Sequence, residues 1–250
     1  WGTWVAGEWD VKGSLATELT GKNYNYPSMS KQYRMSTQKR VYFGPWESYF
    51  LLAEAGVRGW DVPGSPKSNY ENGVTASFEY HGLLSEVGAY LSSTEYNRIG
   101  TSVSFDHTTE AKPYIVNYVD PYTKENKTMT YTYPKNSIYR GGAYNNDAMT
   151  KIFTQKYIAQ VPWLPEEVWS DHRRIGLPFF ENQAVEKDYN PFNQVPLTVA
   201  TSKECRLEFY PKRYRYPANI QTNNLEGYNK ALELLGGPDV VETALWWNLK

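Results

Sequence analysis

The sequence predicts a mostly α-helical protein with one inserted β-hairpin and long irregular loops. Two observations predict the helices: apolar residues recur at helical spacing, and prolines and glycines stand where helices begin and end. A third predicts the hairpin, because two runs of β-branched and aromatic residues flank a polar turn. These signals divide one domain into a loop or strand region (1–43), helices (44–95), a β-rich insertion (96–144), and a helical hairpin with a C-terminal region (145–250).

Residues 1–43 are rich in glycine and polar residues and carry no sustained helical stripe, so short strands or an ordered loop are expected there. The helical pattern begins at Pro45. The apolar stripe of this first helix consists of Trp46, Tyr49, Phe50, Ala53, Val57 and Trp60. A second helix starts at Ser65-Pro66 and ends at Gly82, and a third, shorter helix spans 83–93. One face of the second helix carries Tyr70, Val74, Phe78 and His81.

The hairpin is predicted from strands at 114–119 and 128–133 with a polar turn over 120–127. Two further helices, 149–159 and 165–175, are expected to form an antiparallel pair. Pro165 begins the second of them, and Gly176 follows it at the position where a left-handed residue ends a helix. Residues 179–221 are expected to be irregular, and a last helix covers 224–235. The residues predicted to be buried are Trp46, Phe50, Ala53, Ile152, Phe153 and Trp169.

Five segments, in this order, carry a resemblance to a known family. They are 47–60 (containing YFLLAEA and RGW), 70–80 (YENGVTASFEY), 154–178 (TQKYIA and LPEEVWSDHRRIGLP), 211–224 (PKRYRYP and TNN) and 236–247 (GGPD and LWW). Together they resemble SusD/RagB-like proteins, the outer-membrane nutrient-binding lipoproteins of Bacteroidetes. Two departures stand out: Gly44-Pro45-Trp46 replaces the usual lead-in to the helix of 47–60, and Lys212 occupies the first of two paired arginine positions.

The resemblance implies divergent tetratricopeptide-like helix pairs and a cell-surface protein that binds an oligosaccharide or a peptide. It also implies a partner, a SusC-like TonB-dependent transporter of the outer membrane. A lipid anchor outside this chain would hold the protein at the membrane. Family members are considerably longer than this chain, which therefore resembles a C-terminal half.

The composition excludes several classes of function. A formal net charge of −1 without a basic run argues against a nucleic-acid partner. No apolar run approaches the ~20 residues that a membrane-spanning helix needs. Cys205 is the only cysteine, which excludes an intrachain disulfide, and the thiol is expected to be buried and inert.

Catalytic, metal and cofactor sites are not predicted. Glu166, Glu167 and Asp171 could be considered as a glycosidase acid/base pair, but neighbouring residues on a helix point in different directions. We therefore assign Glu166 and Asp171 to helix-end electrostatics. The three histidines lack the spacing of metal ligands, and His107 beside Asp106 is expected in a solvated loop.

Aromatic residues are the compositional anomaly, with 22 Tyr and 9 Trp against 9 Phe. Tyr and Trp combine apolar rings with polar tips, which suits the binding of hydroxylated ligands such as sugars. The candidate ligand-binding residues lie where no helical face claims them: Trp4, Trp9, Tyr24, Tyr26 and Tyr33. These rings could instead cover helix ends. The function predicted is nutrient binding without catalysis; the alternatives are a truncated carbohydrate-active hydrolase and a structural helical-repeat interaction module.

Overall fold

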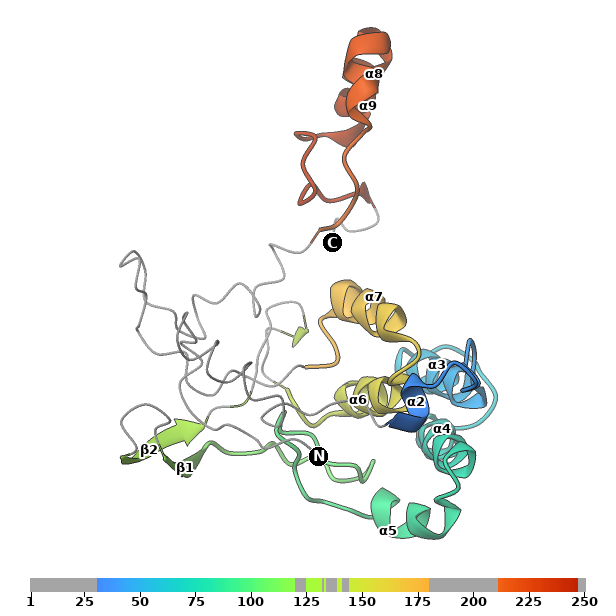
Figure 1. Cartoon of the computed structure of the whole chain (residues 1–250), viewed down its shortest axis with the longest axis vertical. Helices are drawn as coiled ribbons and strands as arrows, with labels where there is room; N and C mark the ends of the chain where they lie inside the picture. Colours follow the sequence, from blue (N-terminus) through green and yellow to red (C-terminus); the bar gives the residue numbers. More distant parts are fainter. Residues whose placement is uncertain are drawn as a thin grey trace. The chain divides into compact units, whose positions relative to one another are not determined.

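The computed structural model describes residues 31–119, 125–131, 133, 139–140, 144–179 and 211–246 (Figure 1). The chain divides into two compact units, Trp1–Cys205 and Arg206–Lys250, and each is described by itself. Within the described ranges the helices of the first unit are α2 (Lys31–Arg34), α3 (Pro45–Val57), α4 (Pro66–Tyr80), the 3-10 helix η2 (Leu84–Glu86), α5 (Val87–Leu91), α6 (Ala148–Gln160) and α7 (Pro165–Ile175). The mostly α-helical prediction is confirmed.

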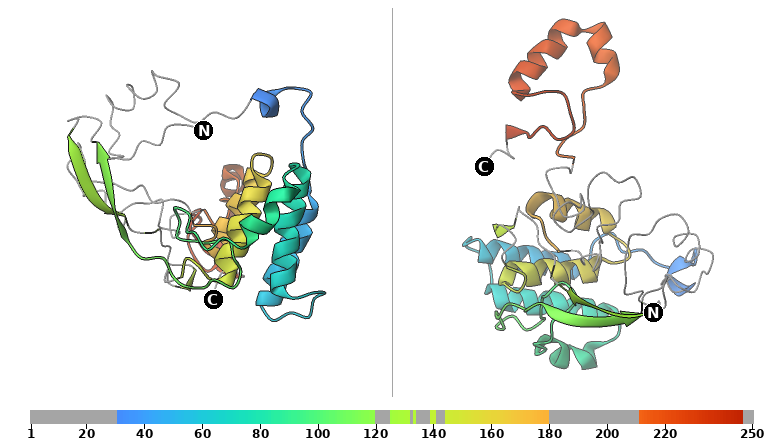
Figure 2. Two further views of the ribbon diagram at one scale, coloured as in Figure 1. Left: turned by 90° about the horizontal axis from the view of Figure 1, so that it is seen from below. Right: turned by 90° about the vertical axis from the view of Figure 1, so that its left-hand side faces the viewer.

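Helices α3 and α4 form a pair that lies side by side, joined by the short loop of residues 58–65 (Figure 2). Local chemistry fixes their ends. Pro45 opens α3, and the Ser65 hydroxyl accepts a hydrogen bond of 3.1 Å from the backbone N–H of Ser68 at the start of α4. Gly73 permits the close packing of the pair, because a Cβ built there would lie 2.8 Å from the Phe50 ring.

Helix α6 is the central helix of the first unit, because its residues from Met149 to Lys156 are all buried. It contacts α3, α4 and α7. Several of its buried side chains are polar, and a buried polar group is costly unless it is hydrogen-bonded or paired. Lys151 and Lys156 both have such partners.

The apolar core joins α3, α4, α6 and the segment that follows α7. Its buried members are Trp46, Phe50, Ala53, Tyr70, Val74, Met149, Ile152, Phe153, Ala159, Leu177 and Phe179. Five of the six residues predicted to be buried are confirmed, but Trp169 is 41% exposed. The inner face of α7 is formed by Val168, Asp171 and His172 instead, at helical spacing i, i+3 and i+4. Hydrophobicity pointed to the wrong face of this helix.

Other stripe positions also differ from the prediction. Trp60 is 69% exposed, because α3 ends at Val57 and Trp60 no longer follows the helical period. His81 is the C-terminal cap of α4 and is exposed. The short helix predicted at 83–93 is present as η2 followed by α5.

The inserted hairpin pairs β1 (Tyr114–Val119) with β2 (Asn126–Tyr131) in antiparallel register, with Val119 opposite Asn126. The first strand lies where the sequence predicts it, whereas the second begins two positions earlier than residue 128. The turn is correspondingly shorter, because the strand register continues into the polar residues Asn126 and Lys127.

The second unit contains α8 (Ala218–Asn223) and α9 (Leu225–Leu235). The predicted last helix is confirmed as α9, whose first turn is capped by the Asn224 side chain and whose end is Gly236 at φ 71°. Helix α8 was not predicted, because its residues lie in a segment read as irregular. Cys205 and Trp247 lie outside the described residues.

Candidate functional site

Of the five predicted ligand-binding aromatics, Tyr33 is the one that the structure describes; Trp4, Trp9, Tyr24 and Tyr26 lie outside the described residues. Tyr33 is partly exposed in α2 and meets Trp163, in the turn between α6 and α7, edge to face at a centroid distance of 5.9 Å. Because offset and edge-to-face pairs are the favoured aromatic geometries, this contact orders Tyr33 against the helical unit.

A second aromatic group lies where α3 begins and α4 ends, and we call it the aromatic end: Tyr42, Phe43, Trp46, Tyr80 and His81. Trp46 is 2% exposed and packs edge-on against Tyr80 at 5.3 Å, and Tyr80 meets the His81 ring at 5.0 Å. Gly44 makes this possible, since a Cβ there would lie 2.3 Å from the Trp46 ring. The unusual Gly44-Pro45-Trp46 lead-in thus builds this arrangement.

The aromatic end combines exposed rings with a buried donor. Tyr42 is 87% and Phe43 65% exposed, and Tyr80 is 46% exposed. The indole Nε1 group of Trp46 is buried and has no hydrogen-bond partner among the described residues. Buried polar groups without a partner are uncommon in proteins, so this region has unused hydrogen-bonding capacity.

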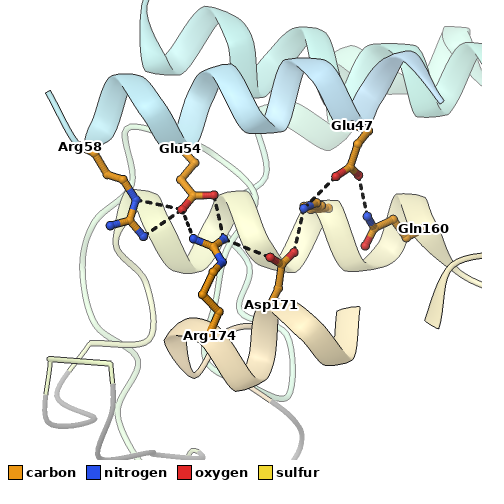
Figure 3. A network of polar contacts seen from close by, with 7 residues as sticks. Glu47, Glu54, Arg58, Gln160, Asp171 and Arg174 are labelled. Atoms are coloured by element: carbon orange, nitrogen blue, oxygen red, sulfur yellow. Dashed lines mark hydrogen bonds and ion pairs between the residues drawn. The ribbon is translucent and has the colours of Figure 1, made fainter. Parts of the chain in front are cut away.

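Helices α3, α6 and α7 are joined by ion pairs whose carboxylates are buried. We call this group the charged seam: Glu47, Glu54, Arg58, Lys156, Asp171 and Arg174 (Figure 3). Lys156 Nζ lies 2.9 Å from Glu47 Oε1 and 2.8 Å from Asp171 Oδ2. Arg174 donates to both oxygens of Glu54, at 2.7 and 3.0 Å, in the bidentate geometry that makes such pairs strong.

The seam balances three carboxylates against three cations, and the pKa values follow. Burial lowers the pKa of Lys156, but its contacts with Asp171 and Glu47 more than offset this, so the pKa is raised overall. Burial likewise raises the pKa of Glu54, but Arg174 and Arg58 hold that pKa below its ordinary value. For Lys156 and Glu54, the opposite charges nearby therefore favour the charged form over the neutral one.

The seam corrects one sequence assignment. Asp171 is not a helix-end charge: it is 8% exposed and binds Lys156 and Arg174. Glu166 lies exposed in the first turn of α7, as assigned. Three of the segments that carried the resemblance, namely YFLLAEA, TQKYIA and LPEEVWSDHRRIGLP, meet here through Glu54, Lys156 and Arg174. Their charged residues therefore build the scaffold.

A second polar cluster, the lysine clamp, surrounds Lys151: Ser102, Asn145, Asn146 and Glu110. Lys151 Nζ donates to Asn146 Oδ1 at 2.6 Å, to Ser102 Oγ at 2.8 Å and to the Ser102 carbonyl at 3.0 Å. The Glu110 carboxylate accepts from the backbone N–H groups of Asn145 and Asn146 at 2.8 and 3.2 Å. The clamp ties both ends of the insertion that contains the hairpin to α6.

The lysine clamp has the atoms of a nucleophilic site but not the access. Ser102 Oγ lies 2.9 Å from His107 Nδ1 and 2.8 Å from Lys151 Nζ, and burial lowers the pKa of Lys151 to about 8. Ser102 is only 1% exposed, however, so a substrate could not reach it. His107 was expected in a solvated loop, but it is half-buried and packs against Tyr96 at 5.4 Å.

Among the residues that the structure describes, no three side chains of His, Cys, Asp or Glu are placed to hold a metal ion. No helix in this part of the chain is long and apolar enough to cross a membrane.

In the second unit, Asp239 joins the segments of the C-terminal motifs. Its Oδ1 accepts from Arg213 Nη1 at 2.6 Å and from the Tyr216 N–H at 3.2 Å, and its Oδ2 accepts from the Tyr228 hydroxyl at 3.3 Å. Arg213 is the second of the paired arginine positions, so Lys212 at the first leaves the ion pair intact. These residues, too, hold structure.

Comparison with known proteins now decides the family. The profile of the SusD-like family, described as "Susd and RagB outer membrane lipoprotein", matches residues 10–248. The chain belongs to the SusD-like family. It is therefore related to outer-membrane lipoproteins, which confirms the localisation that the resemblance implied. None of the curated proteins is similar enough to the chain to count as a match.

Solved structures of other proteins are also similar to this chain. A SusD homologue from Parabacteroides distasonis is 34% identical over 85% of this chain, with a TM-score of 0.54. A homologue from Bacteroides thetaiotaomicron is 28% identical over 86% of the chain (TM-score 0.49), and a chitin-binding homologue from Flavobacterium johnsoniae is 27% identical over 82% (TM-score 0.47). The chain spans 34%, 40% and 36% of these three proteins, respectively.

Proposed function

We propose that this chain is part of a cell-surface protein that binds glycans and partners a TonB-dependent transporter of the outer membrane. The observation that carries the proposal is the family match over residues 10–248, since SusD-like proteins bind carbohydrate without catalysing its breakdown. A peptide is the alternative ligand. The exposed rings of Tyr42, Phe43 and Tyr80 support a sugar-binding surface, because sugar ring faces can stack on aromatic planes.

Capture followed by release requires reversible binding. A shallow aromatic surface with modest affinity serves this purpose better than a deep, closed pocket. We propose that Trp4, Trp9, Tyr24, Tyr26 and Tyr33 contribute to that surface. The contact between Tyr33 and Trp163 supports this for Tyr33, because it holds the ring in place beside the helical unit.

A truncated hydrolase is the less favoured function. Glycoside hydrolysis needs two carboxylates facing one substrate. Among the described residues, the buried carboxylates Glu47, Glu54 and Asp171 are all engaged in the charged seam. A purely structural module is also less favoured, since the rings of Tyr42, Phe43 and Tyr80 are more exposed than a packing role requires.

Binding to an array of glycans and peptides tests the proposal, with melting temperature measured beside affinity. Trp4→Ala, Trp9→Ala and Tyr33→Ala should each weaken glycan binding by roughly tenfold or less, because one aromatic contact contributes on the order of 1 kcal/mol. Their melting temperatures should hardly change. Trp60→Ala is the matched control, because this ring is 69% exposed and lies beyond the C-terminal end of α3, whereas the aromatic end lies at the N-terminal end of that helix.

Two results would count against the proposal. One is the absence of glycan binding by the full-length protein; the other is hydrolysis of a polysaccharide. The transporter partnership is tested separately, by co-purification of the full-length protein with a SusC-like transporter from outer membranes. If the pair does not co-purify, the binding proposal stands and the partnership does not.

A further inference from the structure

Arg140 has an unusual backbone. Its φ is 47°, and it is the one non-glycine residue with positive φ within the described ranges. Residues with a Cβ rarely adopt this left-handed conformation, and such residues cluster at functional sites. Gly141 and Gly142 follow directly, yet the left-handed position is occupied by an arginine. The position therefore retains a side chain where glycine would be less strained.

The Arg140 side chain is held in place over an aromatic ring. Its guanidinium carbon lies 3.8 Å from the centroid of the Tyr144 ring, and its Nη1 donates to Asp147 Oδ2 at 3.0 Å. The Tyr139 hydroxyl donates to the same carboxylate oxygen. The other Asp147 oxygen caps α6 by accepting from the Thr150 N–H at 2.9 Å. The guanidinium is thus fixed at the start of the central helix.

Much of this arrangement faces solvent. The Arg140 side chain is 52% exposed and Tyr144 is 38% exposed. A guanidinium carries five N–H donors in a rigid plane, and Asp147 and the neighbouring Tyr139 occupy only part of them. The Tyr144 hydroxyl has no hydrogen-bond partner in the part of the chain that the structure describes. The exposed surface of Arg140 and Tyr144 therefore offers guanidinium N–H donors, a hydroxyl group and an aromatic ring.

Support of the fold does not explain these features. An exposed ion pair contributes little to stability, and the Tyr139 hydroxyl already binds Asp147. A glycine at position 140 would adopt the same backbone without strain. What an arginine adds is a fixed set of outward donors.

We propose that Arg140 and Tyr144 form a contact site for a neutral saccharide. This rests on the proposed glycan-binding function and names a place and a ligand class for it. The outward N–H groups of Arg140 would donate to sugar hydroxyl oxygens, and the Tyr144 hydroxyl would complete the contact.

Local charge selects a neutral ligand. Arg140 is paired with Asp147, and the Glu110 carboxylate binds the backbone N–H groups of the two residues that follow Tyr144. The buried ammonium of Lys151 interacts electrostatically with both carboxylates, so two cations balance two carboxylates. Without an excess of positive charge the surface does not favour a uronic acid, whereas the hydroxyl groups of a neutral sugar need only the hydrogen-bonding groups described above.

Titration calorimetry on the whole chain tests the proposal, with maltohexaose, cellohexaose, xylohexaose and chitohexaose as neutral probes and hexagalacturonate as the acidic probe. Arg140→Gly is the decisive variant, because it relieves the backbone strain while removing the donors. It should weaken binding of the neutral probe about tenfold or more, the loss of good hydrogen bonds to an ordered site, with the melting temperature unchanged or raised. Arg140→Lys and Tyr144→Phe, which keep the charge and the ring respectively, should weaken it less.

Arg215→Ala is the control, since Arg215 is an exposed arginine of the other unit. If Arg140→Gly binds a neutral probe with the affinity of the wild type, this site is overturned and the proposed function is not. If the melting temperature also falls while the affinity is unchanged, the role of Arg140 is to stabilise the fold. Arg140-dependent binding of hexagalacturonate overturns the neutral ligand class. If the wild-type chain binds none of the neutral probes, the neutral-saccharide site is overturned, whereas the proposed function is decided by the array on the full-length protein.

Discussion

Two buried lysines on α6, five positions apart, have opposite surroundings. Lys156 lies in the charged seam between Glu47 and Asp171, whereas the hydrogen bonds of Lys151 in the lysine clamp go to neutral oxygens of Ser102 and Asn146. Their pKa values move in opposite directions: that of Lys156 is raised, and burial lowers that of Lys151 to about 8. Equal burial therefore has unequal consequences, because the charge of the partners decides which protonation state is favoured.

The difference also separates two ways of joining segments that are distant in sequence. The seam holds α7 against α3 and α6 with charges, while in the clamp Lys151 of α6 donates directly to neutral oxygens. Removing a cation from the seam leaves carboxylates buried without compensation. Removing Lys151 from the clamp leaves neutral acceptors where its ammonium was, and Asn146 Oδ1 keeps the Ser102 N–H. The Glu110 carboxylate keeps its two backbone N–H donors.

The largest effect is expected for Lys156→Met. This change leaves Glu47 and Asp171 without their shared cation, and breaking a buried pair typically lowers the free energy of unfolding by about 3–5 kcal/mol. Urea unfolding monitored by circular dichroism measures it. Glu166→Gln is the control, because Glu166 is an exposed carboxylate on α7, the helix that carries Asp171, and it should change stability by only a few tenths of a kcal/mol. A loss below about 1 kcal/mol for Lys156→Met would contradict the importance of the seam.

The alkaline range should show the second largest effect. The folded-state pKa of Lys151 is about 8 against an ordinary 10.5, so between these values the unfolded chain binds more protons. Stability of the wild type relative to Lys151→Met should therefore rise across this window, by up to about 3 kcal/mol. Lys156, with its raised pKa, keeps its contribution until the pH passes 10.5. Urea unfolding of both proteins from pH 7 to 10.5 gives the difference, and a flat one would exclude a depressed pKa for Lys151.

At neutral pH, Lys151→Met should lower the free energy of unfolding by about 1–3 kcal/mol, less than Lys156→Met, because only neutral acceptors lose a donor. Guanidinium unfolding at pH 7 compares the two variants directly. An equal or larger loss for Lys151→Met would show that the clamp is as dependent on charge as the seam.

The smallest expected effect lies at acid pH. The pKa of Glu54 is lowered in the folded protein, so its contribution to stability is present above pH 4.5 and is lost as the pH falls through the folded pKa. The wild type should lose stability relative to Glu54→Gln as the pH is lowered below 4.5. Melting temperatures between pH 3 and 7 measure this. If the melting temperatures of the wild type and Glu54→Gln fall equally as the pH is lowered, protonation of Glu54 is not what destabilises the protein in acid.

Much of the candidate site was not open to prediction from sequence. The ligand candidates were chosen as rings outside helical stripes, a rule that passed over the exposed ring of Tyr80, because the sequence places Tyr80 within a helix. Tyr33 was chosen by the same rule, but it lies in the short helix α2. Arg140 gave no signal, since a left-handed arginine has no sequence pattern. A Gly-Gly pair next to an arginine between two tyrosines is the one hint that could have drawn attention to it.

The sequence by itself determined where most helices begin and end. Pro45, Ser65-Pro66 and Gly176 act on backbone groups within four residues of themselves, so the capping chemistry is local and readable. Tertiary structure alone decided which face of α7 turns inward and which charges meet. Glu47 and Gln160 lie 113 residues apart in the chain, and Glu54 and Arg174 lie 120 apart. Hydrophobic pattern placed Trp169 inside, but a buried ion pair with the right partner can bring Asp171 inward instead, and no local signal reveals a partner that far away.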